Sequence, residues 1–356
     1  MEIVEKIRIK DIAVRSGVSV GTVDRVLHKR PNVSKSAREK VEKVLKEINY
    51  QPNMYASALA YNKHYAFYAI IPEHDSEAYW EEIEEGLMNA CAFRRDFHIS
   101  VEIRYYKLYD HESFANAFKD ATDNRANGVI IVPTDYKETH EYTDRLKELE
   151  IPFILLDSYI KELEPLSFYG QDPVMSGFFA ARMLMLIAAG DKEIMLMKQT
   201  KGGKTASRQQ RYREVGFRQY MEKNHPDVKI TVVDLPLTEE RSKYDDILDA
   251  FFDSHKGVRQ CITMGSKAHL VGDYLLRKGR KGIQIMGYDM VGKNAACLRK
   301  GSISFLIAQH AFMQGYKSVD SLFRAVVLKQ DIAPVNYMPI ELLSKENVDY
   351  YHKEQM

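Results

Sequence analysis

The chain has 356 residues, of which 45% are hydrophobic and 28% are charged, and its formal net charge is only +1. This composition is ordinary for a globular protein, and the length leaves room for about two or three domains with cores of their own. The sequence has no apolar run long enough to span a bilayer, so we expect no membrane segment. The first residues are charged and lack the apolar stretch of a secretion signal, and the three cysteines are widely spaced. We therefore expect a cytoplasmic protein with reduced thiols.

Charge is unevenly distributed along the chain. Residues 1–64 carry 13 Lys and Arg against 7 Asp and Glu, a net charge of +6, whereas the rest of the chain has a net charge of −5. A basic segment on a mildly acidic body favours a polyanion as the partner of that segment alone. A solvated basic surface would give the same count, so the local sequence pattern has to distinguish the two interpretations.

Two short helices joined by a tight turn are predicted near the start of the chain. Ile9 and Ile12 lie at helical spacing, and Gly17 follows at the position of a terminating glycine. Ser19 then occupies the N-cap position of a second helix over residues 20–27. This is the helix-turn-helix arrangement, whose second helix enters the major groove of DNA.

A third helix is predicted after this pair. Ser36 and Glu39 have the spacing of a capping box, which stabilises the first turn of a helix. An apolar stripe follows at helical spacing over residues 41–48, and Pro52 disfavours helical structure at the residue before it. Three small helices with a basic exterior predict a DNA-binding head.

The sequence from residue 7 to residue 59 resembles the DNA-binding head of the lactose repressor/galactose repressor (LacI/GalR) family of bacterial transcriptional regulators. The shared pattern consists of K-D-I-A, then S-G-V-S-x-x-T-V-x-R-V-L, then N-V-S, and finally Y-x-P-N with a closing A-x-x-L. The resemblance implies a homodimer that binds a double-stranded DNA operator as a repressor and is gated by a small carbohydrate-type effector. It also implies a fold: a three-helix helix-turn-helix head, a hinge helix, and a two-lobed α/β body similar to type I periplasmic binding proteins.

The resemblance assigns roles to residues of the head. Arg25 falls at a base-contacting position, where a guanidinium can bind guanine O6 and N7, and Val20 and Gly21 fall at neighbouring base-contacting positions. Ser19 and Thr22 suit contacts to phosphates, which position the head without reading sequence. The remaining members of the implied DNA-binding set are Asn32, Ala56 and Leu59.

Residues 52–59 resemble the hinge helix of the same family. In such proteins two hinges pair in the minor groove, and Leu59 matches the leucine that wedges between base pairs and kinks the duplex. A linker that is helical for packing reasons is the alternative. Because the segment is too short to be a stable helix in isolation, we expect it to order only on DNA.

Two positions of the head depart from the family pattern. Arg8 stands where the family usually has a capping threonine, and Asp24 stands where it usually has serine. Asp24 can accept a hydrogen bond from cytosine N4, or it can orient Arg25 or Lys29. We favour the orienting role because phosphates repel a carboxylate.

Alternating strands and helices are predicted for the remainder of the chain. Amphipathic helical stretches, for instance 80–93 and 141–150, lie between apolar strand-like runs, which predicts parallel sheets with crossover helices. The expected domains are a head (1–51), a hinge (52–63) and a two-lobed body (64–356), with crossings between the lobes near 160–168 and 290–309. The predicted strands are 66–72, 99–106, 128–133, 152–157, 193–198, 230–236, 260–264, 283–289 and 303–309.

Polar residues that follow strands are the candidates for binding the effector. In a two-lobed body of this kind, ligands bind in the cleft at the carboxyl ends of the strands. Arg213 and Asp289 are the strongest candidates, because each combines a family match with a side chain that can grip a polyol or a carboxylate. Trp80 is the single tryptophan and could hold the apolar face of a sugar, although core packing explains it nearly as well. The implied effector-binding set is Tyr79, Trp80, Asp135, Asp157, Asp172, Arg213, Ser266, Asp289 and Gln309.

The sequence leaves the charge of the effector open. Residues 264–267 read Met-Gly-Ser-Lys where the family usually has Asn-Asp, so one sugar-binding carboxylate is missing. A sugar acid or a sugar phosphate is therefore one hypothesis, and a solvated basic loop is the other. The basic residues that raise this question are Lys198, Lys201, Lys204, Arg208 and Arg211.

Two other classes of protein compete with this interpretation. The stretch KQTKGGKT (198–205) is close to a phosphate-binding loop, which would indicate an NTP-dependent enzyme with a fused DNA-binding head, but Lys198 replaces the first glycine. A solute-binding protein would account for the body, but the basic head and the missing secretion signal argue against it. No metalloprotease or serine-hydrolase motif occurs, and we expect neither enzymatic activity, nor a cofactor, nor a metal.

Overall fold

The computed structural model describes two compact units, Met1–Tyr61 and Asn62–Met356. The division between them falls inside the hinge predicted over residues 52–63, of which only Lys63 is among the described residues. Each unit is described by itself below. The described residues are 8–27, 31–48, 63–75, 79–108, 110–134, 136–188, 190–201, 204–205, 207–236 and 240–351.

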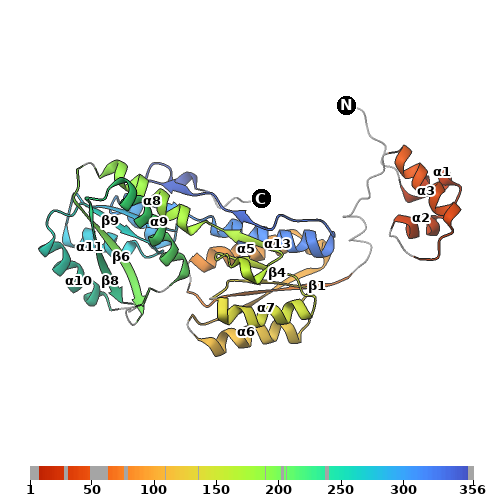
Figure 1. Cartoon of the computed structure of the whole chain (residues 1–356), viewed down its shortest axis with the longest axis horizontal. Helices are drawn as coiled ribbons and strands as arrows, with labels where there is room; N and C mark the ends of the chain where they lie inside the picture. The colour runs from red at the N-terminus through yellow and green to blue at the C-terminus, as the bar shows by residue number, and fades with distance from the viewer. Residues whose placement is uncertain are drawn as a thin grey trace. The chain divides into compact units, whose positions relative to one another are not determined.

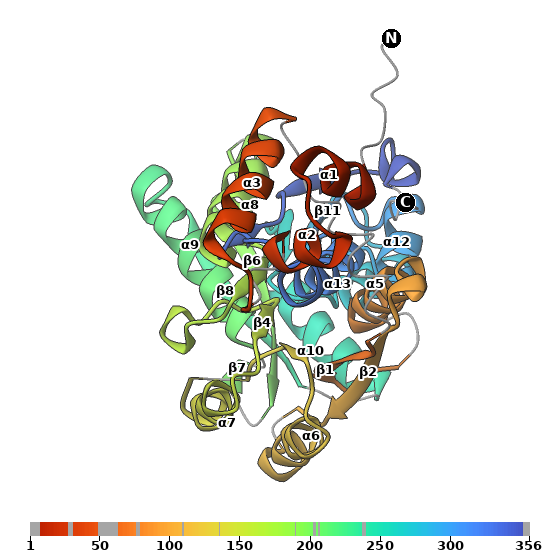
Figure 2. The same ribbon diagram turned by 90° about the vertical axis from the view of Figure 1, so that its right-hand side faces the viewer.

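The first unit is a bundle of three short helices (Figure 2). They are α1 (Ile9–Ser16), α2 (Val20–Leu27) and α3 (Lys35–Glu47). Each helix is amphipathic, and the three apolar faces meet in one small core because none of them could bury its apolar stripe alone. The buried members of that core are Ile12, Ala13, Val23, Val26, Val41 and Val44.

The ends of these helices follow the sequence pattern with one correction. Gly17 ends α1 with a φ of 66°, the left-handed conformation that favours glycine, and the backbone N–H of Thr22 donates to Ser19 Oγ at 3.1 Å. The capping box predicted at Ser36 is wrong, because Ser34 is the N-cap of α3 and accepts from the N–H of Ala37 at 3.3 Å. The two serines are separated by only one residue, so spacing alone did not distinguish them.

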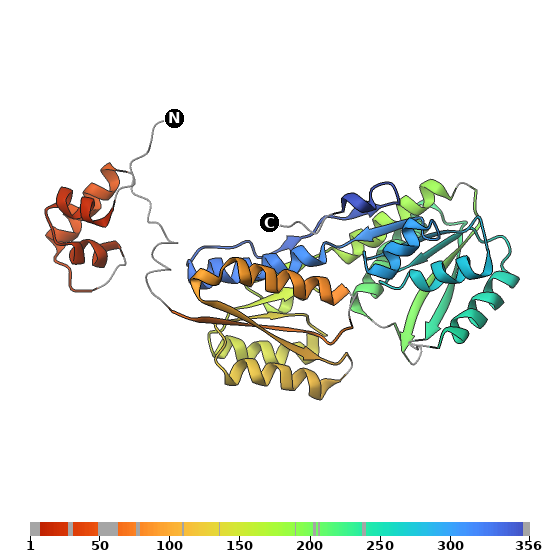
Figure 3. The same ribbon diagram turned by 180° about the vertical axis from the view of Figure 1, so that it is seen from behind.

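One lobe of the second unit contains a six-stranded sheet in the order β12-β5-β4-β3-β1-β2, in which every pair is parallel. Helices α6 and α7 cover one face of the sheet, and α5 and α13 cover the other (Figures 1 and 3). The strands are β1 (Tyr65–Pro72), β2 (Ile99–Tyr106), β3 (Gly128–Ile131), β4 (Phe153–Leu156), β5 (Ser167–Gly170) and β12 (Asn336–Tyr337). The helices are α5 (Tyr79–Phe93), η1 (Arg95–Phe97), α6 (His111–Asp123), α7 (Tyr136–Glu148), η2 (Lys161–Leu163), α13 (Ala311–Leu322) and the π-helical turn η3 (Phe323–Val327).

The other lobe contains a seven-stranded sheet in the order β13-β11-β10-β9-β6-β7, with β8 also paired to β6. The β6–β7 and β11–β13 pairs are antiparallel, and the remaining pairs are parallel. The strands are β6 (Glu193–Lys201), β7 (Lys204–Thr205), β8 (Lys229–Pro236), β9 (Gln260–Thr263), β10 (Gln284–Tyr288), β11 (Phe305–Ala308) and β13 (Glu341–Leu343). The helices are α8 (Pro173–Ile187), α9 (Arg208–Asn224), α10 (Arg241–Ser254), α11 (His269–Lys278), α12 (Gly292–Arg299) and η4 (Val348–Tyr350).

Strand β6 shows how one run of sequence builds both layers of this lobe. Side chains alternate between the two faces of a strand. Ile194 and Leu196 accordingly join the core beneath α8 and α9, whereas Met195 and Met197 join the core beneath α10 and α11. A strand that is buried on both faces reads as a continuous apolar run, which is why such runs in the sequence predicted parallel strands correctly.

The chain passes between the two lobes three times. The first crossing follows β5, a few residues beyond the predicted 160–168, and the second follows β11, close to the end of the predicted 290–309. A third crossing joins β12 to β13 and was not predicted, because both strands are too short to give a hydrophobic pattern. Gln171 connects all three, since its Nε2 donates to the carbonyl oxygens of Ala308 at 3.1 Å and Pro339 at 2.8 Å.

Two pairs of helices pack closely enough to require glycine. In one lobe, a Cβ at Gly86 of α5 would overlap the carbonyl oxygen of Phe312 on α13. In the other, a Cβ at Gly177 of α8 would overlap the carbonyl oxygen of Arg213 on α9, and a Cβ at Gly216 would overlap that of Val174. The close contact between α8 and α9 therefore fixes the backbone from which Arg213 projects. Within the described residues, no helix combines the length and the apolar character that crossing a bilayer would need.

Candidate functional site

A cavity of about 420 Å³ lies where the two lobes of the second unit meet. Its walls include residues that directly follow parallel strands of both sheets: Asp157 after β4, Asp289 after β10 and Gln309 after β11. The carboxyl ends of parallel strands leave backbone groups and loops free to meet a ligand, so this is the expected place for a binding site in an α/β fold. The volume is also within the range that small-molecule sites occupy.

Asp157 and Asp289 occupy corresponding places in the two lobes. Each has a positive φ, 63° and 70° respectively, which is uncommon for a residue other than glycine. Each donates its backbone N–H to the neighbouring strand, Asp157 to Tyr169 O at 2.9 Å and Asp289 to Ile307 O at 3.0 Å. Such a local conformation is retained at functional sites when the surrounding structure enforces it. It turns both carboxylates away from their sheets and into the cavity wall.

Arg213 supplies positive charge that acts on both carboxylates. It lies on α9 and is only 3% exposed. One guanidinium nitrogen donates to Met264 O at 2.9 Å, and the guanidinium stacks on the Tyr288 ring at 4.0 Å from its centroid. No ion pair joins Arg213 to either aspartate among the described residues. The guanidinium is therefore held by neutral partners, and a bound ligand can use its remaining hydrogen-bonding capacity.

Burial sets the protonation behaviour of the two aspartates. Desolvation raises the pKa of Asp289 from 3.8 to about 6, and the positive charge of Arg213 and a 2.6 Å hydrogen bond from Gln309 Nε2 only partly oppose this. Desolvation also raises the pKa of Asp157, although Arg213 and the hydroxyl of Tyr79 act in the opposite direction. Carboxylates held at such a cost inside a cavity are candidates for contact with polar ligand groups.

The aromatic pair at the start of α5 has a different environment at each residue. Tyr79 is buried, donates its hydroxyl to Asp157 Oδ1 at 3.0 Å and accepts from Gln314 Nε2 at 3.0 Å. Trp80 is half-buried, packs edge-on against Tyr79 and lines the cavity. The indole is therefore available to the apolar face of a ligand, while Tyr79 positions Asp157.

Several buried polar atoms around the cavity have no hydrogen-bond partner among the described residues. They are Nε of Arg213 and the side-chain carbonyl oxygens of Gln209, Gln309 and Gln314. Leaving a buried polar atom unpaired costs about 1–3 kcal/mol, so each needs an explanation. The first three belong to residues that line the cavity, and a ligand rich in hydroxyl groups would satisfy a donor and acceptors together.

The other predicted effector-binding residues have different locations. Ser266 lines the cavity. Asp172 does not; its carboxylate instead accepts from the N–H of Met175 at 3.0 Å and caps α8, which gives this aspartate a structural role. Asp135 lies outside the described residues. The cavity as a whole contains Tyr79, Trp80, Asp157, Arg213, Ser266, Asp289 and Gln309 of the predicted set.

Of the basic residues that suggested an anionic effector, Lys198, Arg208 and Arg211 do not line this cavity. Lys198 forms an ion pair with Glu214 at 2.6 Å, and the guanidinium of Arg208 lies over the Tyr212 ring. The side chains of Lys201 and Lys204 lie outside the described part of the chain. The described basic side chains of this cluster therefore give no support to a negatively charged ligand.

Sequence reasoning missed several cavity residues. Gln209 lies one helical turn before Arg213 on α9 and donates its side-chain amide to Asp157 O in the opposite lobe. Its spacing from Arg213 was a usable signal, since residues four apart share one face of a helix. His74, Lys267, His269 and Lys293 also line the cavity. Lys267 lies in the stretch 264–267 whose departure from the family pattern raised the question of the effector's charge, whereas nothing in the local sequence marks the other three.

The described residues of the stretch that resembled a phosphate-binding loop form an antiparallel strand pair. Thr200 of β6 pairs with Thr205 of β7, and Lys201 pairs with Lys204, in antiparallel register. A phosphate-binding loop instead wraps an anion between a strand and a helix N-terminus. Among the described residues, no group of three or more His, Cys, Asp and Glu side chains is placed to hold a metal ion.

The first unit presents the predicted DNA-binding residues on the outer face of α2. Ser19, Val20, Gly21 and Arg25 are exposed, with Val20 at 45%, whereas Val23 and Val26 turn inward to the core. Ser19 and Thr22 also bond to one another through their hydroxyls at 2.9 Å. Asn32 has a positive φ of 65° in the segment before α3. Ala56 and Leu59 lie outside the described residues.

Arg8, which replaces a capping threonine, still begins α1. Its backbone N–H donates to Asp11 Oδ2 at 2.7 Å, so the acidic residue in the first turn stabilises the helix start.

Comparison with protein families gives two matches. The model of the bacterial regulatory proteins of the lacI family matches residues 8–53, and a periplasmic binding protein domain matches residues 68–330. Together they cover most of the first unit and most of the second.

Individual proteins that are similar to this chain include transcriptional regulators and an operon repressor. The chain is 27% identical over 177 residues to the HTH-type transcriptional regulator MalR of Streptococcus pneumoniae, covering 49% of this chain and 52% of that protein. It is 30% identical over 158 residues to the ribose operon repressor of Halalkalibacterium halodurans, covering 44% and 45%. The chain thus spans about half the length of these curated relatives. A crystal structure of a Bacteroides fragilis protein assigned to the LacI transcriptional regulators is 41% identical, with a TM-score of 0.77, and the match covers 82% of this chain and 100% of that one.

Proposed function

Because this chain belongs to the LacI family of bacterial regulatory proteins, with a periplasmic-binding-protein-like body, we propose that it is a ligand-gated, DNA-binding transcriptional repressor. The observation that carries the proposal is the presence, in one chain, of a helix-turn-helix head with an exposed arginine and a two-lobed body with a polar cavity. The relatives named above are transcriptional regulators and repressors rather than enzymes, so the NTP-dependent enzyme is not supported.

In this proposal the first unit binds DNA and the second unit binds the effector. The outer face of α2 enters the major groove, Arg25 reads a guanine, and Ser19 and Thr22 contact phosphates. Two heads act together in a homodimer, joined to their bodies by hinges that contain Ala56 and Leu59. A regulator of the chromosome works in the cytoplasm, where we place the protein.

The proposed effector is a carbohydrate-type molecule, with a sugar acid or a sugar phosphate among the candidates. Arg213, Asp289 and Gln309 would bind its hydroxyl groups, and Trp80 would pack on its apolar face. Donors and acceptors without partners on the cavity wall suit a polyol, since each hydroxyl can both donate and accept. Ligand binding would shift operator affinity only to the extent that the two states of the body bind the ligand differently.

The DNA-binding role is tested with a duplex enriched by the full-length chain from a randomised double-stranded library. In competition titrations, Arg25→Ala should lower the preference for the enriched duplex over random DNA by about 10- to 100-fold, because one bidentate base contact contributes about 1–3 kcal/mol. Arg15→Ala, an exposed arginine at the end of α1, is the matched control and should leave the preference unchanged. Equal preference in the Arg25 variant and the wild type would contradict the proposed reading residue.

The effector role is tested by thermal shift with a panel of neutral sugars, uronic acids and sugar phosphates. A ligand of the native state stabilises it by mass action, so panel members that bind should raise the melting temperature. Arg213→Met should weaken binding of the most stabilising member by about 10-fold or more, as expected for losing hydrogen bonds from a charged donor. Arg218→Met, on the same helix but half-exposed, is the control. No shift with any member would contradict a carbohydrate effector.

A further inference from the structure

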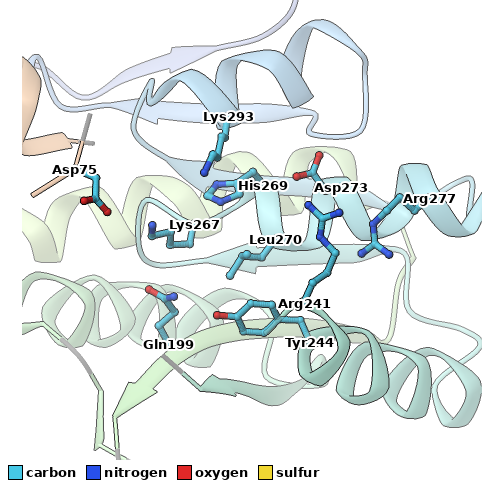
Figure 4. A pocket seen from close by; sticks show the side chains of 10 residues that line it. All are labelled: Asp75, Gln199, Arg241, Tyr244, Lys267, His269, Leu270, Asp273, Arg277 and Lys293. Atoms are coloured by element: carbon cyan, nitrogen blue, oxygen red, sulfur yellow. The ribbon is translucent and has the colours of Figure 1, made fainter. Parts of the chain in front are cut away.

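A second cavity of about 660 Å³ lies mainly within one lobe, and Figure 4 shows the side chains that line it. Its walls come from the N-terminal ends of three helices: Arg241 begins α10, His269 begins α11, and Lys293 is the second residue of α12. Because a helix carries positive partial charge at its N-terminus, three such ends around one space favour a negatively charged occupant.

The two cavities are continuous. Lys267, His269 and Lys293 line both of them, together with Asp75 and Gln199. A ligand held by Arg213 and Asp289 in the first cavity can therefore extend past these shared residues into the second. The first cavity already has the volume of an ordinary small-molecule site, so the second is additional space for a further group of the same ligand.

The second cavity has cationic groups that form no ion pair among the described residues, and they outnumber the two carboxylates, Asp75 and Asp273, that line the same walls. Lys267, Lys293 and Arg241 form no ion pair with the described residues. Arg277, in contrast, makes a two-pronged pair with Asp245 at 2.6 Å for each nitrogen–oxygen contact. We call the space lined by Arg241, Lys267, His269 and Lys293 the basic compartment.

His269 is the buried member of the basic compartment, and its hydrogen bonds fix which nitrogen faces the cavity. The residue is 7% exposed, and Nδ1 lies 3.0 Å from Asn294 Oδ1. The amide nitrogen of Asn294 donates to the carbonyl oxygens of Ser266, Tyr288 and Asp289, so its Oδ1 must be the acceptor and His269 Nδ1 the donor. Burial lowers the pKa of His269, so the ring is neutral and Nε2 is its acceptor. Nε2 has no partner among the described residues and can accept a hydrogen bond from a hydroxyl group of the ligand.

We propose that the basic compartment binds the negatively charged group, a carboxylate or a phosphate, of a carbohydrate effector whose sugar ring occupies the cavity of Arg213 and Asp289. The inference rests on the proposed function, because it specifies the class of effector for that same site. Lys267 and Lys293 neutralise the anion at the junction of the two cavities, and Arg241 extends the positive surface away from the junction. This assignment replaces the basic loop at residues 198–211, whose described basic side chains (Lys198, Arg208 and Arg211) line neither cavity.

The test compares matched ligands on the full-length chain by calorimetric titration. Each neutral sugar of a set (glucose, galactose and mannose) is paired with its uronic acid and its 6-phosphate. We expect at least one charged member to bind about 10-fold or more tightly than its neutral parent, as hydrogen bonds to charged groups would provide. The double variant Lys267→Met, Lys293→Met should remove that preference while the neutral parent binds as before. The uronic acid and phosphate arms distinguish the two sources of negative charge.

Two controls make the outcomes separable. Lys300→Met alters an exposed lysine at the far end of the helix that carries Lys293, and it should leave the preference unchanged. Inorganic phosphate alone tests the compartment without a sugar.

Neutral sugars that bind in an Arg213-dependent way, without tighter binding of their charged counterparts, would overturn the inference and leave the proposed function standing. A charge preference that survives the double variant, or phosphate binding as tight as that of the sugar phosphate, would also overturn it. Failure of every member to bind would overturn both.

Discussion

At the scale of single residues, the cavity between the lobes contains two aspartates whose burial and backbone conformation are energetically unfavourable. Asp157 and Asp289 are both buried, both have a left-handed backbone, and both have a raised pKa because burial penalises their charged forms. Arg213 offsets part of that penalty without pairing with either carboxylate. In the proposed function these residues lower the stability of the protein without ligand, as is common where function and stability compete.

Asp289→Asn tests this trade-off through its pH dependence. The folded-state pKa of about 6 exceeds the ordinary 3.8, so the folded state binds the proton more tightly and this group lowers stability as the pH rises from about 4 to about 6. The neutral amide removes that loss. We expect the variant to be more stable than the wild type by up to roughly 3 kcal/mol at pH 7, with the difference vanishing below about pH 4.

Urea unfolding of both proteins across that pH range measures the difference. Asp172→Asn is the control, because its carboxylate caps α8 outside the cavity and asparagine is an equally good cap. A stability difference for Asp289→Asn that does not change between pH 4 and pH 7 would refute the role assigned to burial.

At the scale of elements, close packing of α8 against α9 positions Arg213. The two helices meet at Gly177 and Gly216, where each glycine faces a carbonyl oxygen of the other helix (Gly177 that of Arg213 and Gly216 that of Val174). The equivalent pair in the other lobe, α5 and α13, meets in the same way at Gly86 and Gly315. Both sheets are thus covered on one face by a helix pair whose separation only glycine permits, and in one lobe that pair carries the guanidinium.

Gly216→Ala should therefore affect both stability and the site. The added methyl overlaps the backbone of Val174, so we expect a loss of about 1–3 kcal/mol in the free energy of unfolding and weaker binding of the most stabilising sugar. Gly257→Ala in the same lobe is the matched control, because no atom lies near its Cβ and its φ is not positive. Equal melting temperatures for the two alanine variants would show that α8 and α9 pack less closely than the structure shows.

At the scale of the whole molecule, charge and packing both separate the chain into two units. Residues 1–64 have a net charge of +6 and the remainder −5, and the described parts of the two units have hydrophobic cores of their own. Electrostatic attraction to DNA depends on phosphate contacts and therefore weakens steeply as salt increases. The head should consequently account for almost all of the salt dependence.

A chain that begins at residue 64 should bind no DNA between 50 and 200 mM salt, while the full-length chain loses affinity steeply over that range. The shortened chain should still bind the most stabilising sugar of the panel, because its cavity is built from residues beyond position 72. Gel retardation and calorimetry measure the two properties separately. Retardation of DNA by the shortened chain at 100 mM salt would contradict the division between the units.

The sequence by itself determined the elements whose signals are local. The turn at Gly17, the cap at Ser19, and each apolar run predicted as a body strand were found because turn chemistry and burial on both faces leave a mark on consecutive residues. The short strands β5, β7, β12 and β13 left no such mark, and neither did the third crossing between the lobes. Arg213 and Asp289 were proposed from motif matches. The sequence could not predict that both side chains are buried, or that Arg213 contacts neutral groups and forms no ion pair with Asp289.

Only the tertiary structure decided which charges meet. Lys198 belongs to a partly buried ion pair with Glu214, although its sequence neighbours made it a candidate for binding an anion. Asp172, predicted to bind the effector, caps a helix. Lys267, His269 and Lys293 lie together because α11 and α12 begin beside one cavity, although the first and last of them are 26 residues apart. Secondary structure depends on neighbours along the chain, so the sequence shows it locally. A binding site is formed where the fold brings together the ends of several strands and helices. Because these ends are far apart in the sequence, no local pattern predicts the site.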